Sequence, residues 1–153
     1  MKKATKFVVL ALAMACASLV VACNDPYGSG AKVALDVTDT IHSAADTVHS
    51  ARTTGVISVS EEREAQEYFS IINKADTAFG GCLKAAHNAG GKAASVIACT
   101  NVFSTTISDP TFLAQVHIVD TKIQETVVAV SQTVSGFING LVIALQNLQA
   151  KGK

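Results

Sequence analysis

The stretch DTIHSAADTVHSA, residues 39–51, contains one six-residue pattern twice, because residues 39–44 (DTIHSA) recur seven positions later as residues 46–51 (DTVHSA). Apolar side chains in residues 31–52 are spaced four and three residues apart, at Val37, Ile41, Ala44, Val48 and Ala51. This spacing places one apolar stripe along a helix, and a seven-residue period is typical of helices that pack side by side. The stretch therefore predicts a bundle helix that ends at Thr53-Thr54-Gly55.

Two further helices are predicted after this stretch. Residues 60–88 follow the segment VISV (56–59), which we interpret as a lead-in rather than a strand, with Ser58 or Ser60 as the N-cap. Acidic residues in the first turn of this helix suit the positive end of the helix dipole. Residues 92–107 predict a shorter helix. The two apolar stripes are Ala65, Tyr68/Phe69, Ile72, Ala75, Phe79, Cys82/Leu83 and Ala86, and then Val96, Cys99/Thr100, Phe103 and Ile107.

The last predicted helix is the longest. Asp109 is a suitable N-cap and Pro110 suits the first helical position. One stripe then continues to the end of the chain, at Phe112, Val116, Val119, Ile123, Val127, Val130, Val134, Phe137/Ile138, Leu141, Leu145 and Leu148. At 1.5 Å per residue this helix would be roughly 60 Å long. With no period-two alternation in the sequence, the predicted fold is all-α, an elongated bundle of three or four helices.

The N-terminus has the pattern of an export signal. Residues 1–6 contain three lysines, and residues 7–22 (FVVLALAMACASLVVA) carry no charge. A basic segment before a short apolar core is typical of a secretory signal peptide, and sixteen residues are fewer than the roughly 20 that span a bilayer.

The signal ends in Val20-Val21-Ala22-Cys23, which resembles the lipobox of the bacterial lipoprotein signal class, with Val20 where Leu is more usual. The resemblance covers residues 1–23 and implies a diacylglyceryl group on the Cys23 thiol, cleavage before Cys23, and acylation, as with palmitate, of the new N-terminus. Two or more acyl chains make a stable membrane anchor, whereas one does not. The alternative is ordinary cleavage after Ala22, which would leave Cys23 unmodified.

This processing would divide the chain into a signal peptide (1–22), a polar tether containing Gly and Pro (23–30) and one α-helical domain (31–153). We expect the protein in the bacterial cell envelope, facing the periplasm. Asn24, rather than Asp, directly follows Cys23, which favours the outer over the inner membrane. Removal of the signal leaves nine basic against twelve acidic residues, a net charge of −3. A mildly acidic chain of this kind indicates no nucleic-acid partner.

Two of the four cysteines would remain after lipidation. Cys16 leaves with the signal, Cys23 carries the lipid, and Cys82 and Cys99 lie equally far on either side of Gly90-Gly91. A helical hairpin that turns at these glycines brings the two cysteines level with each other. An even number of cysteines in an exported chain predicts a structural disulfide between Cys82 and Cys99, of about 3 kcal/mol on the loop-entropy model.

Residues 126–150 are 25 positions without a charge, followed by Lys151 and Lys153, so length and flanks permit a membrane span. However, Gln132, Asn139 and Gln146 recur every seven residues on the side away from the apolar stripe. Since an amide exposed to lipid is costly, we interpret this segment as a bundle helix with a polar face in water. The alternative layout, a lipidated N-terminus with a C-terminal span, is similar to that of phage unimolecular spanins, which bridge two membranes.

The positions of the histidines do not predict a metal site or a catalytic site. Asp39, His42, Asp46 and His49 form one stripe, but the two histidines are about 10 Å apart along a helix axis, too far to share one metal ion. We interpret the stripe as a polar flank of the repeat, and His87 as a residue that complements the dipole at a helix C-terminus. The sequence has no Gly-rich phosphate loop, GxSxG, HExxH or CxxC motif. It therefore predicts no catalytic residue, no metal, no cofactor and no enzyme.

These patterns together predict a lipid-anchored envelope bundle that works as a protein-interaction or structural module. Its expected partners are membrane lipid, through the N-terminal anchor, and an unidentified protein. Self-association through the seam of small residues is left open. The alternatives are the spanin-like bridge, with residues 126–150 in a membrane, and a carrier that holds a small molecule or lipid between its helices.

Overall fold

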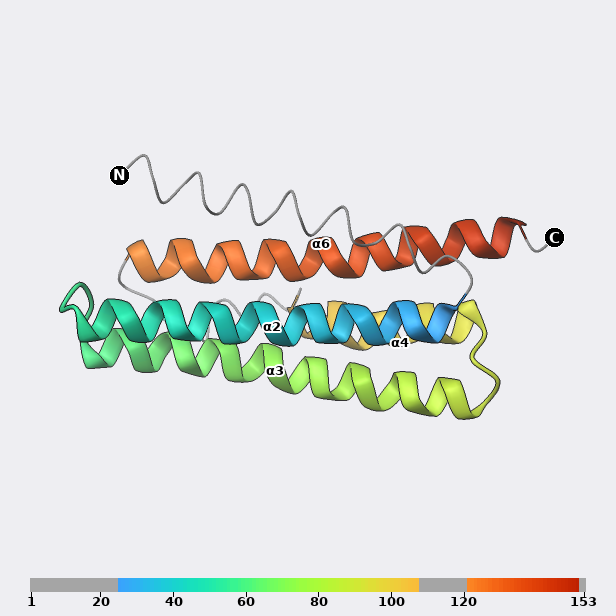
Figure 1. The fold of residues 1–153 in the computed structure, drawn as a ribbon, viewed down its shortest axis with the longest axis horizontal. Coiled ribbons are helices and arrows are strands. Elements are labelled where there is room, and N and C mark those ends of the chain that lie inside the picture. Colours follow the sequence, from blue (N-terminus) through green and yellow to red (C-terminus); the bar gives the residue numbers. More distant parts are fainter. Residues whose placement is uncertain (1–24, 108–120, 152–153) are drawn as a thin grey trace.

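The computed structural model describes residues 25–107 and 121–151 (Figure 1). They form the helices α2 (Pro26–Thr53), α3 (Val59–Asn88), α4 (Ala93–Ile107) and α6 (Thr121–Lys151). No strand occurs in either described range. The all-α fold class is therefore confirmed. The predicted signal peptide, Cys23 and the start of the last helix, with Asp109 and Pro110, lie outside the described residues.

Successive helices run in opposite directions along the bundle (Figure 1). Helices α2 and α4 each pack mainly against α3 and α6, so that α2 faces α4 across one diagonal and α3 faces α6 across the other. Helices α3 and α6, of 30 and 31 residues, are each about 45 Å long, whereas α4, of 15 residues, is half that length. We call the end with the start of α2, the α3–α4 turn and the end of α6 the Pro26 end, and the end with the α2–α3 loop the Gly55 end.

Helix α2 begins earlier than the sequence pattern predicts. The tether expected at residues 23–30 is wrong for residues 26–30, which form the first turns of α2. The Asp25 side chain accepts a hydrogen bond from the Tyr27 amide, and Pro26 occupies the first turn. An N-cap aspartate followed by proline starts a helix because the proline φ is already helical and its missing N–H is not needed there.

Helix α3 begins as predicted. Ser58 is its N-cap and forms a capping box with Glu61, so that each side chain bonds the backbone of the other. Residues 54–58 form the loop between α2 and α3, and Val59 is the first helical residue, so that VISV (56–59) leads into α3 and is not a strand. The α3–α4 turn lies at Gly90 and Gly91, whose φ angles of 103° and 60° suit glycine.

The apolar stripes meet in one core. The described members of every predicted stripe are buried or packed against the core, and Ala51 and Leu148 lie at its margin. On α6, Val127, Val134 and Leu141 are buried, whereas Gln132 and Asn139 are exposed.

One helix in the described part of the chain, over Ile123–Lys151, is long and apolar enough to cross a membrane. Its mean hydropathy reaches 1.7, and 33% of the most apolar window is buried inside the bundle. Apolar side chains on the buried side of such a helix are equally those of a bundle core.

Candidate functional site

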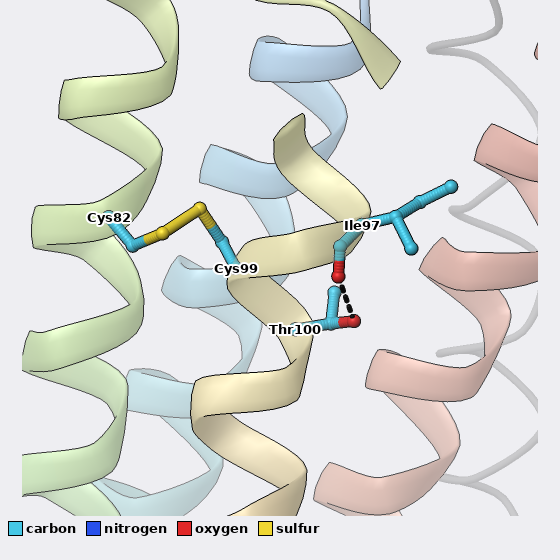
Figure 2. The surroundings of a disulfide bond; sticks show 4 residues. All are labelled: Cys82, Ile97, Cys99 and Thr100. Atoms are coloured by element: carbon cyan, nitrogen blue, oxygen red, sulfur yellow. Dashed lines mark hydrogen bonds between the residues drawn. A yellow bond between two sulfur atoms is a disulfide. The ribbon is translucent and has the colours of Figure 1, made fainter. Parts of the chain in front are cut away.

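The predicted disulfide is present. Cys82 on α3 and Cys99 on α4 are bonded, with their Cα atoms 5.6 Å apart (Figure 2). Cys99 is buried and Cys82 half-buried. One residue further along α4, the buried Thr100 hydroxyl donates a hydrogen bond to the Ile97 carbonyl, and the Ile97 side chain extends toward α6. Short helix α4 is therefore held to α3 covalently and to α6 by packing.

The side chains of the histidine stripe of α2 do not gather into one cluster in the described part of the chain. Asp39, His42 and Asp46 are exposed, and no group of three or more His, Cys, Asp or Glu side chains converges among the residues that the structure describes. His49 instead lies against α3, where its Nδ1 is 2.8 Å from Glu62 Oε1. The other carboxylate oxygen of Glu62 is 2.7 Å from Nε of Arg52 in the last turn of α2. Glu62 thus connects the two helices beside the Gly55 loop.

His87 lies in the last turn of α3, as expected for a residue that complements the helix dipole. Its ring also stacks on Tyr27, with ring centroids 4.1 Å apart. The contact joins the first turn of α2 to the last turn of α3 at the Pro26 end.

A buried carboxyl group was not predicted from the sequence. Asp76 on α3 is only 6% exposed, and its Oδ2 accepts a hydrogen bond of 2.7 Å from the Thr38 hydroxyl on α2. Its Oδ1 is buried and has no hydrogen-bond partner among the residues that the structure describes. Burial raises the pKa of Asp76, and the bond from Thr38 opposes this only in part. The signal was in the sequence, because Ile72, Asp76 and Phe79 follow the same four-three spacing as the apolar stripe.

Tyr68 provides a second polar contact in the core. Its hydroxyl forms a hydrogen bond with Ser131, which connects α3 to the diagonal helix α6. Burial raises the pKa of Tyr68 to about 12. Burial thus raises the pKa of both Tyr68 and Asp76, and each of them pairs with a hydroxyl group of another helix. Each of the two contacts joins side chains of different helices.

The two ends of the bundle differ in charge. Three lysines at the Pro26 end are exposed: Lys84 in the last turns of α3, Lys92 in the α3–α4 turn and Lys151 at the end of α6. Lys32, two turns into α2, is paired with Asp36 at 3.1 Å. The acidic residue nearest this end is the N-cap, Asp25.

The Gly55 end is acidic. Among the described side chains within about two turns of this end, five are acidic and two are basic. The acidic residues are Asp46, Glu61, Glu62, Glu64 and Glu125, and the basic residues are Arg52 and Arg63. The bundle is thus electrically polarised along its long axis.

Comparisons with protein-family models, with curated proteins and with solved structures find no match to this chain. Any functional assignment therefore depends on the residues of the chain itself.

Proposed function

We propose that this chain is a lipid-anchored bundle of the bacterial cell envelope, which stands on a membrane as a spacer or protein-interaction module. The observation that carries the proposal is the lipobox-like Val20-Val21-Ala22-Cys23 directly after an uncharged apolar segment. Acylation at Cys23 would make a stable anchor, because several acyl chains together hold a protein at a bilayer.

Two features of the bundle support this proposal. The disulfide between Cys82 and Cys99 fits an oxidising compartment such as the periplasm, where such bonds persist. Moreover, the N-cap of α2 is Asp25, so only Asn24 stands between it and Cys23. A rod about 45 Å long attached at its tip would place the Gly55 end far from the lipid.

Mass spectrometry of the protein purified from membranes tests the anchor. We expect a mature chain that begins at Cys23, carries acyl groups and contains the bonded pair Cys82–Cys99. A Cys23→Ala variant should keep an unprocessed N-terminus or lose the acyl mass. An unmodified full-length chain in the cytosol, with free thiols at Cys82 and Cys99, would overturn the proposal. Affinity purification of the acylated form from membranes would then identify the protein partner.

The spanin-like bridge is the second candidate, because Ile123–Lys151 is long and apolar enough to cross a membrane. The two functions differ in where α6 lies. In the bundle, α6 packs against α2 and α4, and Gln132 and Asn139 face water. Protease treatment of membranes that hold the protein distinguishes the bundle from the bridge. The disulfide is reduced and the bundle unfolded before the protease is added. Residues 126–150 that then stay protected by the bilayer would favour the bridge.

A further inference from the structure

The exposed lysines of the Pro26 end lie where the proposed lipid anchor would join the bundle. Helix α2 begins at Pro26, three residues after Cys23. Three residues of chain reach at most about 10 Å in any conformation. An acylated Cys23, held in the bilayer, would therefore keep the Pro26 end within about 10 Å of the lipid headgroups, which is about one Debye length at 0.1 M salt.

The residues that share this end form a basic surface. The stacked rings of Tyr27 and His87 place the start of α2 beside the end of α3, one turn from Lys84. Lys92 follows in the α3–α4 turn, and Lys151 ends α6 at the same end of the bundle (Figure 1). All three lysines are exposed and form no ion pair within the described residues. Asp25, the nearest acidic residue, is occupied in capping α2.

We propose that Lys84, Lys92 and Lys151 form a docking surface for the anionic headgroups of the phospholipid bilayer that holds the anchor. This proposal rests on the proposed lipid anchor at Cys23. Charge complementarity would orient the rod, since the basic end faces anionic lipid while the acidic Gly55 end is repelled from it. The anchor sets the distance and the lysines set the orientation. The Gly55 loop is then presented to the aqueous compartment.

The expected strength of docking follows from the number of lysines at the Pro26 end. Each lysine near an anionic membrane surface shifts a binding equilibrium roughly fivefold. Removal of all three should therefore lower the ratio of docked to undocked rods by up to about a hundredfold. The effect should decrease with salt, because exposed charges are screened.

Hydrogen exchange of the acylated full protein in vesicles measures docking. We expect the amides of turn 89–92 to exchange more slowly on vesicles of phosphatidylcholine with phosphatidylglycerol than on phosphatidylcholine alone, while loop 54–58 shows no difference. The variant K84Q/K92Q/K151Q should lose the difference at turn 89–92. The control R63Q/K74Q, which removes two exposed positive charges away from the Pro26 end, should keep most of it.

Flotation with neutral vesicles measures membrane binding by the acyl anchor alone, without a contribution from anionic headgroups. A protein that floats with both kinds of vesicle but exchanges equally fast at turn 89–92 on each would overturn the docking surface and leave the anchor intact. An equal loss of protection in the control R63Q/K74Q would also overturn it, since the effect would then come from net charge. A protein that fails to float with neutral vesicles would overturn the anchor and, with it, the docking proposal.

Discussion

Reduction of the disulfide between Cys82 and Cys99 gives the most direct test of how the bundle is stabilised. The bond closes a loop with a sequence separation of 17 residues. On the loop-entropy model, a loop of this size restricts the unfolded chain by about 3 kcal/mol. The free energy of unfolding should therefore fall by about 3 kcal/mol on reduction, which corresponds to a decrease in melting temperature of about 10 °C for a domain of this size.

Urea unfolding followed by circular dichroism, with and without a thiol reductant, measures this difference. The reduced wild-type protein is the better comparison, because it removes the cross-link alone. The double variant Cys82→Ala and Cys99→Ala also removes a buried sulfur atom at Cys99, which adds about 1 kcal/mol. This variant serves as the control, since its unfolding should not respond to the reductant.

Two results would refute the reasoning. Equal stability of the oxidised and reduced proteins would mean that the loop is not a significant restriction on the unfolded chain. A loss of helical signal on reduction without urea would mean that the bond instead holds α4 in the native state. An isolated helix of 15 residues such as α4 is only marginally stable in water, so its helicity depends on its contacts with α3 and α6.

Four further predictions concern single residues. Because burial raises the pKa of Asp76, its contribution to stability is largest below its unfolded pKa of 3.8 and is lost as pH rises through the raised value. Asp76→Asn should therefore raise the urea midpoint at pH 7 and flatten its dependence on pH. Gly81→Ala should raise the free energy of unfolding by about 1 kcal/mol, because Gly81 is helical and an added Cβ would meet open space. Gly30→Ala should cost about 1–2 kcal/mol net, because its Cβ would lie 2.7 Å from Leu83 Cδ2, and a neutral result would show that Leu83 can move. The pKa of Tyr68 is raised from 10.0 to about 12, so its contribution to stability is present below pH 10 and lost between these values. Tyr68→Phe should remove this alkaline loss, as followed by thermal melts.

Local sequence patterns are enough to predict the helices and much of their burial pattern. Helix α3 was expected at residues 60–88 and lies at Val59–Asn88, because its capping box and stripe are local features. The disulfide could also be predicted, since a turn at Gly90-Gly91 makes Cys82 and Cys99 level in any antiparallel hairpin. A period of three and four residues fixes which side of a helix is apolar without knowledge of its neighbours.

Which helices are neighbours depends on how they pack in three dimensions, and so does the environment of each polar side chain. The spacing of Asp76 fits the buried side of α3, but its hydrogen-bond partner, the Thr38 hydroxyl of α2, depends on how α2 and α3 pack. The contact of Glu62 with Arg52 and the stacking of His87 on Tyr27 likewise join residues of different helices. The grouping of three lysines at one end required the antiparallel order of α3, α4 and α6. Such contacts depend on the distance between separate helices, and the periodicity of a single helix does not specify that distance.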